Sequence, residues 1–254
     1  MALLTITNVS KNFGGVKAVQ DFSLVAELGE IHGIIGPNGA GKTTVFNIIS
    51  GVYPIESGTV ILDGVDITRL EQYQITREGI GRTFQNIRLF RGLNVLENVM
   101  CAFDPQSKYG IINSLIPGPK RWSEEKRGRE ICRHFIEVVG LINYINENPF
   151  NLPYGFQRKL EIARALTCNP KVLLLDEPAA GLNPSEVDEL TRLIEQLSRD
   201  IGFAIIIIEH RLDLIMSLSK TIHVMNFGKI IAVGTPDEVR NNADVIEAYL
   251  GKEE

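Results

Sequence analysis

The sequence predicts an α/β fold built on a parallel sheet, and three observations lead to this expectation. A glycine-rich loop, Gly36–Thr43, stands between a short apolar strand and a helix. Val172–Leu175 and Ala204–Ile208 are continuous apolar runs, which are typical of parallel strands buried on both faces. Open α/β sheets of this kind bind their ligands at the carboxyl ends of the strands.

The composition is that of an ordinary globular domain: 254 residues, 44% hydrophobic and 22% charged. Net charge is −5 and the pI about 5.5, with no basic stripe, so nucleic acid is not an expected partner. Neither a membrane-spanning run nor a signal-peptide pattern is evident, and we expect a cytosolic chain. Its three cysteines form no C-x-x-C pair, which predicts reduced, partly buried thiols rather than disulfides or a zinc site.

The loop Gly36–Thr43 matches the pattern G-x-x-x-x-G-K-[ST]. Its glycines allow backbone N–H groups to turn toward phosphate oxygens, and the start of the next helix adds a positive dipole. Lys42 supplies a cation, and the hydroxyl of Thr43 suits Mg²⁺. The alternative is a glycine-rich turn without a ligand. The following helix is expected to bury Val45, Phe46, Ile48 and Ile49.

Residues 3–26 predict short strands with Phe13 in the turn between them. An aromatic side chain there suits stacking on a purine, and local packing is the alternative. Residues 59–62 predict another strand, followed by a hairpin turn at Asp63-Gly64. Gln85 is expected to end a strand. Its side chain is either a surface amide, or it binds a metal or water and thereby senses a γ-phosphate.

From Asn94 to about Leu152 the pattern becomes helical and predicts a lobe inserted into the α/β core. Residues 105–119 carry Gly and Pro breaks and predict a loop or broken helix. The two apolar helical faces are expected to contain Leu93, Leu96, Val99 and Met100, and then Ile131, Phe135 and Val138. Residues 152–168 predict a helix with Leu160, Ile162, Ala163 and Leu166 directed inward.

Charged side chains follow both buried strands. Asp176 and Glu177 end the first, and Glu209 and His210 end the second. Because parallel strands end at one edge of a sheet, we expect these groups to converge there. The alternatives are a solvated acidic loop and a structural histidine, and we assign His32, His134 and His223 to structural roles.

Helix and turn signals continue to the end of the chain. Asn183-Pro184-Ser185-Glu186 predicts a capped helix start. Residues 222–233 predict a hairpin that turns at Asn226-Phe227-Gly228. Thr235 predicts another capping box, which opens a last helix that runs to Leu250.

Taken in order, these motifs resemble those of the ATP-binding subunits of ABC transporters over the full length of the chain. Leu152-Pro153-Tyr154-Gly155-Phe156 stands where that family has its signature L-S-G-G-Q. Gln85 matches the Q-loop, Val172–Asp176 the Walker B strand and His210 the H-loop, and Gly181, Leu182 and Asn183 match the D-loop.

The resemblance implies a P-loop NTPase core of the RecA-like type, with an N-terminal antiparallel β subdomain and an inserted α-helical subdomain. Residues 1–254 are then one ABC ATPase domain, with the core in 1–90 and 160–254 and the helical subdomain in 91–159. It also implies ATP and Mg²⁺ as ligands. The expected ATP-binding residues are Phe13, Gly36, Pro37, Asn38, Gly39, Ala40, Gly41, Lys42, Thr43 and Thr44.

The catalytic residues implied are Glu177 as general base, His210 as γ-phosphate sensor and Lys42. The metal-binding residues implied are Thr43, Gln85 and Asp176. Two ATPase subunits, alike or different, would meet head to tail, so that each ATP lies between one phosphate loop and the other chain's signature. Further implied partners are transmembrane permease subunits and, indirectly, a periplasmic-type substrate-binding protein, which places the chain peripherally on the cytoplasmic face of the inner or cell membrane.

Within this family, the sequence around Gln85, the segment 179–184, Tyr154 and the ending 247–251 look like the ATPases of branched-chain amino acid importers. The lipopolysaccharide-export ATPase is the nearest alternative. A soluble ABC ATPase of translation or DNA repair is disfavoured by the single cassette without heptads. A GTPase or small-molecule kinase is disfavoured by Gln85, the signature and His210.

The signature departs from the family pattern at two positions. Pro153 replaces a serine whose hydroxyl would bond the γ-phosphate, and Phe156 replaces a glutamine. Proline is compatible with a helix start, and Gly155 still offers its N–H. Losing one such hydrogen bond costs about 1–3 kcal/mol, at the ATP held by the opposite subunit. We therefore expect a heterodimer with one weak composite site.

Overall fold

The computed structural model describes residues 2–103 and 119–250. The chain divides into two compact units, each described by itself below. The first contains the residues up to Gln85 together with those from Lys171 onward, and the second is Asn86–Pro170. The sequence places these boundaries near residues 90 and 160. In the structure they fall after Gln85 and after Pro170. The second boundary lies beyond 160 because helix α6 (Tyr154–Thr167) stays whole and packs against the other helices of the second unit.

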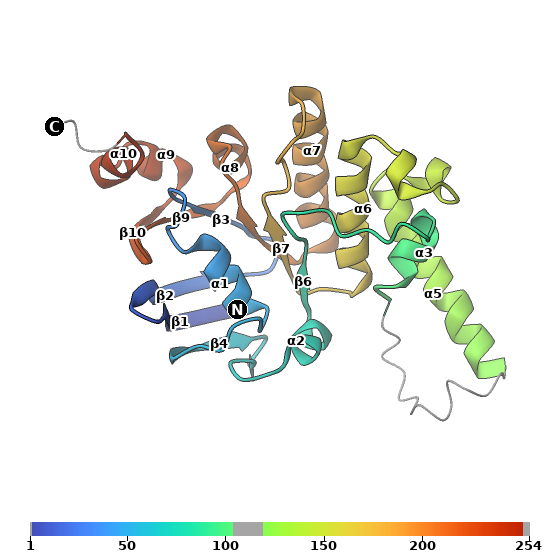
Figure 1. Cartoon of the computed structure of the whole chain (residues 1–254), viewed down its shortest axis with the longest axis horizontal. Coiled ribbons are helices and arrows are strands. Elements are labelled where there is room, and N and C mark those ends of the chain that lie inside the picture. The colour runs from blue at the N-terminus through green and yellow to red at the C-terminus, as the bar shows by residue number, and fades with distance from the viewer. Residues whose placement is uncertain (1, 104–118, 251–254) are drawn as a thin grey trace. The chain divides into compact units, whose positions relative to one another are not determined.

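A six-stranded sheet in the order β10-β9-β3-β8-β7-β6 forms the centre of the first unit (Figure 1). All neighbouring strands are parallel except β9 and β10, which form the predicted hairpin. Every residue of β3, β7 and β8 is buried, as predicted for strands covered on both faces. The strands are β3 (Ile31–Ile35), β6 (Ile80–Arg82), β7 (Val172–Asp176), β8 (Ala204–Ile208), β9 (Thr221–Asn226) and β10 (Lys229–Gly234).

A second sheet of four antiparallel strands has the order β2-β1-β4-β5. Its first two strands are 10 and 11 residues long rather than short. Asp63 and Gly64 both have positive φ, at 50° and 80°, which is the backbone of the predicted two-residue hairpin turn. The strands are β1 (Leu4–Phe13), β2 (Val16–Ala26), β4 (Ser57–Leu62) and β5 (Val65–Asp66).

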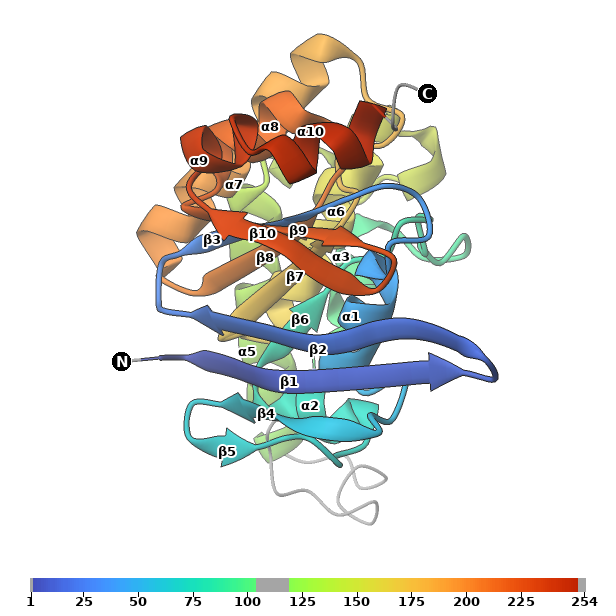
Figure 2. The same cartoon turned by 90° about the vertical axis from the view of Figure 1, so that its left-hand side faces the viewer.

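Helices cover both faces of the six-stranded sheet. Figure 2 shows α7, α8, α9 and α10 along one face, and α1 with the four-stranded sheet on the other. The apolar positions predicted for α1 are all buried in the core between the two sheets, where Phe46 and Phe22 are the largest side chains. The helices of this unit are α1 (Lys42–Ile49), α2 (Gln72–Glu78), α7 (Pro184–Ile201), α8 (Leu212–Leu218), α9 (Pro236–Arg240) and α10 (Ala243–Leu250).

The capping predictions hold, but one helix length is wrong. Asn183 and Glu186 form the predicted reciprocal cap of α7. Thr235 caps α9 in the same way, yet the expected single helix to Leu250 is two helices. The chain breaks because the Asn242 side chain accepts hydrogen bonds from the N–H groups of Asp244 and Val245, and asparagine favours such caps over a helix interior.

The second unit is helical. Its elements are α3 (Val95–Met100), α5 (Pro119–Val138), α6 and two 3₁₀ turns, η1 (Ile142–Tyr144) and η2 (Pro149–Asn151). The expected inward residues of α6 are all buried. The loop expected at 105–119 lies outside the described residues except for Pro119, which begins α5.

The apolar faces of α3 and α5 are rotated relative to the prediction. On α3 the buried residues are Val95, Asn98 and Val99, because the Asn98 amide donates to the backbone carbonyls of Phe90, Leu93 and Asn94. On α5 the buried line is Gly128, Cys132 and Ile136, with the predicted residues half-buried beside it. A Cβ at Gly128 would lie 2.8 Å from the Phe103 ring.

The central strand β8 provides a test of the core. Ile206 is fully buried and pairs with both β3 and β7. We expect Ile206→Ala to lower the free energy of unfolding by about 2–5 kcal/mol, because the lost side chain leaves a cavity. Equilibrium urea unfolding measures this. Ile201→Ala, at a residue that is 44% exposed, is the control, and an equal loss in both variants would contradict the described core.

Candidate functional site

The phosphate loop follows β3 and leads into α1, and its glycines are required by close backbone contacts. Gly36 has φ +149°, and a Cβ there would lie 2.1 Å from the carbonyl oxygen of Met225 in β9. Gly41 has φ +104°, and its Cβ would lie 2.3 Å from the carbonyl oxygen of Ala18 in β2. Gly228 donates to the carbonyl of Ala40 at 3.0 Å. The loop is therefore held between β2 and the β9–β10 hairpin.

Lys42 is buried and turns its ammonium group back into this loop. Its Nζ donates to the carbonyl oxygens of Gly36 at 2.7 Å and Pro37 at 3.0 Å. Burial lowers the pKa of Lys42, and the nearby carboxylates Glu177 and Asp176 oppose that shift. The positive charge of Lys42 is thus held by neutral carbonyl groups. An anionic phosphate would bind this ammonium group more strongly than the carbonyls do.

A cleft of about 400 Å³ brings the loop together with residues from distant parts of the chain. This volume suits a small-molecule ligand. Of the residues expected from the sequence, Asn38 through Thr44, Gln85, Glu177 and His210 all line it. The other lining residues are Val16, Lys17, Ala18 and Phe227.

Glu177 lies at the centre of the convergence that the sequence predicts. Its Oε2 accepts from Nε2 of Gln85 at 2.8 Å, and its Oε1 lies 3.1 Å from Nε2 of His210. Its backbone has the rare positive φ of 48°, fixed by a hydrogen bond from its N–H to the carbonyl of Ile208. Each carboxylate oxygen keeps a further lone pair for a water molecule.

Gln85 does not end a strand as expected. Strand β6 stops at Arg82. The N–H of Thr83 still bonds the carbonyl of Leu174, but the N–H of Asp176 bonds the side-chain hydroxyl of Thr83 at 3.3 Å, so the backbone pairing ends there. Gln85 therefore reaches Glu177 from an irregular segment.

Asp176 ends β7 and is buried. Its Oδ2 accepts from Nη2 of Arg82 at 3.0 Å, whereas its Oδ1 has no hydrogen-bond partner among the described residues. Burial raises the pKa of Asp176, and the Arg82 guanidinium opposes this. An unpaired buried carboxylate oxygen fits a hard cation such as Mg²⁺, which proteins hold with one or two carboxylates plus substrate phosphates.

Glu209 is a site residue to which the sequence assigned no role. It is buried, and its Oε1 accepts from the N–H of Ala179 at 2.6 Å, while Oε2 accepts from those of His210 and Arg211 at 3.0 and 3.4 Å. Burial raises the pKa of its carboxyl group, and these backbone hydrogen bonds oppose the shift. Glu209 thus joins the segment after Glu177 to the one that carries His210. The sequence signal that could have indicated this role is the position of Glu209 beside His210 at the end of a buried strand.

The D-loop residues follow Glu177 closely in the chain and lead into α7. Gly181 has φ +80°, Leu182 donates its N–H to the carbonyl of Ala179 at 3.2 Å, and Asn183 caps α7.

Phe13 does not line the cleft: its ring packs edge-on against Tyr53 at 5.0 Å, with the Lys11 ammonium 5.4 Å from its centre. Adenine stacking by Phe13 stays a prediction.

The signature segment lies in the second unit and begins α6, as expected. Pro153 is the N-cap and provides no side-chain hydrogen bond. The hydroxyl of Tyr154 accepts from Nη2 of Arg158 at 2.8 Å, and Leu152 and Gly155 are buried. Phe156 packs against Tyr144, with 5.3 Å between ring centres. The aromatic residue at 156 therefore has a packing role within this unit.

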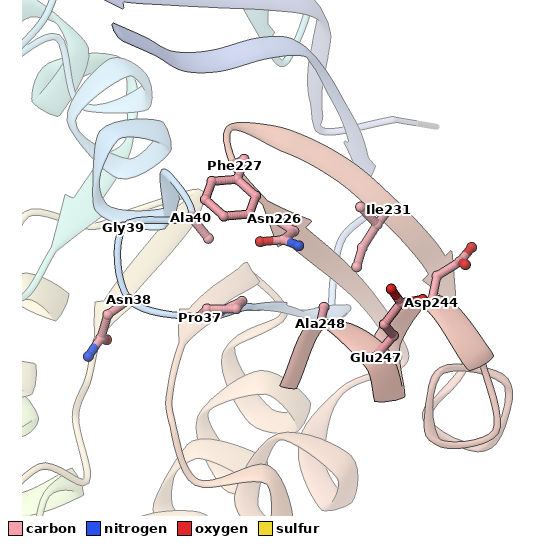
Figure 3. Close-up of a pocket in the computed structure, with 10 residues that line it drawn as sticks. All are labelled: Pro37, Asn38, Gly39, Ala40, Asn226, Phe227, Ile231, Asp244, Glu247 and Ala248. Atoms are coloured by element: carbon pink, nitrogen blue, oxygen red, sulfur yellow. The ribbon is translucent and has the colours of Figure 1, made fainter. Parts of the chain in front are cut away.

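A larger hollow of about 660 Å³ is also lined by residues of the phosphate loop (Figure 3). The loop, the β9–β10 hairpin and α10 form it, and the charged residues that line it are the acids Asp244 and Glu247. With carboxylates and no lysine or arginine in its lining, it does not suit a triphosphate. The smaller cleft around Lys42 is the better candidate for an anionic ligand.

Comparison with family models finds two matches. Residues 19–180 match a family described as ABC transporter. Residues 229–254 match one described as Branched-chain amino acid ATP-binding cassette transporter.

The chain is similar to curated proteins over nearly its whole length. It is 44% identical to the high-affinity branched-chain amino acid transport ATP-binding protein LivG of Salmonella typhimurium, covering 98% of both chains. It is 36% identical to the lipopolysaccharide export system ATP-binding protein LptB of Escherichia coli, over 100% of this chain and 99% of that one.

Solved structures agree. A nucleotide-free ATP-binding cassette from an ABC transporter has a TM-score of 0.85 at 33% identity, covering 99% of this chain and 100% of the other. The ADP conformation of the cassette MJ1267 has a TM-score of 0.85 at 32% identity, with the same coverage.

The phosphate loop offers a matched pair of glycine variants. Both Gly36 and Gly39 have positive φ, but a Cβ at Gly36 meets the Met225 carbonyl whereas at Gly39 it meets nothing within 4 Å. We expect Gly39→Ala to destabilise by about 1–2 kcal/mol through backbone strain alone, and Gly36→Ala to cost more and to weaken nucleotide binding at least tenfold. Thermal unfolding and fluorescent-ATP titration measure both; equal effects would contradict the packing of the loop against β9.

Proposed function

Because this chain belongs to the ABC transporter family of ATP-binding subunits, we propose that its 400 Å³ cleft binds MgATP and that Glu177 activates the hydrolytic water. The observation that carries this proposal is the convergence of Lys42, Gln85, Glu177 and His210 on one cleft. The chain is an ATP-binding and ATP-hydrolysing subunit that powers a membrane transporter.

The loop residues would bind the triphosphate through their backbone N–H groups and through Lys42. Phosphate oxygens would displace the carbonyls of Gly36 and Pro37 from the Lys42 ammonium group. Charged acceptors would then replace neutral ones, which strengthens the hydrogen bonds. Thr43, Asp176 and Gln85 are the proposed metal-binding residues. Mg²⁺ at this position would supply charge that stabilises the phosphate oxygens.

Glu177 is the proposed general base. Its carboxylate would accept a proton from the water that attacks the γ-phosphate, while Gln85 and His210 hold it in place through their present contacts. The amide of Gln85 and the imidazole of His210 lie where they would sense the γ-phosphate. In phosphoryl transfer most of the acceleration comes from positioning and electrostatic stabilisation, which this arrangement of fixed polar groups suits.

We further propose that the transported substrates are branched-chain amino acids. This rests on the relative LivG, which is 44% identical, against 36% for the lipopolysaccharide-export relative, and on the branched-chain family model at residues 229–254. Among the described residues, the linings of the cleft and of the 660 Å³ hollow show no feature that would select an amino acid, so selection would lie in the permease and binding-protein partners.

The proposed assembly is a pair of ATPase subunits on transmembrane permeases, at the cytoplasmic face of the membrane. Within residues 2–103 and 119–250, no helix has both the length and the apolar character needed to cross a bilayer. Each ATP would contact the phosphate loop of one subunit and the start of α6 of the other. Because Pro153 lacks a hydroxyl, this chain would support the opposite ATP weakly, which favours a second, different ATPase subunit.

The first test separates binding from hydrolysis. Glu177→Gln keeps the shape of the side chain but removes its basicity, and we expect ATP hydrolysis to fall by about 10²–10⁴-fold with MgATP affinity retained. Phosphate release and equilibrium nucleotide titration measure the two. Glu130→Gln, at an exposed residue of α5, should leave both unchanged. Normal hydrolysis by Glu177→Gln would exclude Glu177 as the base.

The second test concerns the signature. Pro153→Ser should raise the ATPase rate of this chain by itself by about tenfold, the equivalent of one hydrogen bond of about 1–3 kcal/mol. Adding Phe156→Gln completes the family pattern but also removes the contact with Tyr144, so thermal unfolding must be measured alongside. No gain from either variant would contradict a signature defect.

The third test identifies the partners. Affinity purification of the tagged chain from detergent-solubilised native membranes, followed by mass spectrometry, should recover permease subunits and a second ATPase. Genes for a periplasmic-type binding protein and two permeases should neighbour this one. Envelope-assembly factors in either experiment would instead support lipopolysaccharide export.

A further inference from the structure

Arg82, the last residue of β6, makes a set of contacts that the roles proposed above do not include. Its guanidinium donates from Nη1 to Oδ1 of Asn47 and Oγ of Ser50, both at 2.8 Å, and from Nη2 to Oδ2 of Asp176 at 3.0 Å. The Arg82 side chain is 9% exposed and that of Asp176 4%. A buried ion pair therefore lies at the end of β7.

Two aromatic rings flank this guanidinium. Its Cζ lies 5.7 Å from the centre of the Phe46 ring and 5.2 Å from that of Phe84. Such contacts favour the cation and keep water away from the pair with Asp176. The planar fork of arginine fits this position, whereas the single ammonium of a lysine cannot reproduce the same directions.

The contacts of Arg82 join three segments of the proposed site. Asn47 and Ser50 belong to α1 and the residue after it, which follow the phosphate loop. Asp176 ends the acidic strand, and Phe84 directly precedes Gln85. The position of one side chain therefore relates the loop, the acidic strand and the Q-loop to one another.

The geometry of the pair is not that of a closed ion pair. Arginine and a carboxylate often form two parallel hydrogen bonds that satisfy both oxygens. Here Nη1 turns away to Asn47 and Ser50, and Oδ1 of Asp176 stays without a partner among the described residues. A buried carboxylate oxygen left unpaired is costly, unless it serves a ligand.

We propose that Arg82 is a positioning residue that orients the Asp176 carboxylate, holding Oδ2 so that Oδ1 is presented to the divalent cation of the nucleotide. The proposal rests on the proposed MgATP site and assigns to Arg82 no contact with the nucleotide. Residues that orient a metal ligand typically contribute 10–100-fold in metal affinity.

The test measures the metal and the nucleotide separately. A fluorescent ATP analogue is titrated into the full chain with EDTA, and then at a fixed concentration with increasing Mg²⁺. For Arg82→Lys and Arg82→Gln we expect affinity in EDTA within twofold of wild type, and at least tenfold more Mg²⁺ for half-maximal enhancement. Arg133→Gln, at an exposed residue of α5, is the matched control and should behave as wild type.

A second variant covers the case in which the Arg82 variants do not fold. Asn47→Ala removes one anchor of the guanidinium and leaves Asp176 intact; we expect about two- to tenfold more Mg²⁺ for half-maximal enhancement, the equivalent of one hydrogen bond. Thermal unfolding establishes that each variant is folded.

The proposal is wrong if folded Arg82 variants need the same Mg²⁺ as wild type, or if their affinity falls equally with EDTA and with Mg²⁺, as a purely structural pair would cause. Failure of the wild-type chain to bind the analogue at all would instead refute the proposed MgATP site.

Discussion

Parallel pairing of three buried strands is the constraint on which the rest of the structure depends. Because β3 pairs with β8 and β8 with β7, all three end at one edge of the sheet. The phosphate loop follows the first, Glu209 and His210 follow the second, and Asp176 ends the third with Glu177 directly after it. The phosphate loop therefore shares a cleft with Glu177 and His210, which lie more than a hundred positions further along the chain, and no local interaction could achieve this.

The buried charges of Lys42 and Asp176 at this edge of the sheet are only partly compensated by neighbouring groups. Lys42 is held by neutral carbonyls, and Asp176 has one oxygen in an ion pair and one without a partner in the part of the chain that the structure describes. Neither arrangement fully compensates the buried charge among the described residues. A bound magnesium triphosphate would supply both missing partners, which links the stability of the cleft to its occupancy.

Close backbone packing fixes the positions of the phosphate loop and of Glu177. Gly36 and Gly41 are required because neighbouring strands approach the loop too closely for any side chain. The positive φ of Glu177 stores local strain at the proposed base and is maintained by its hydrogen bond to β8. Sites built on buried strands in this way hold their geometry better than sites on exposed loops.

The sequence by itself determined the core strands, the phosphate loop and the strand ends that carry Glu177 and His210, because apolar runs and glycine spacing are local signals. It misplaced the end of β6 and the break at Asn242, where side-chain hydrogen bonds to the backbone override periodicity. Only the tertiary structure decided the partners of Asp176 and the role of Glu209 in joining two loops. Hydrogen bonds between residues far apart in the chain leave no periodic pattern, so their geometry exists only once the sheet has formed.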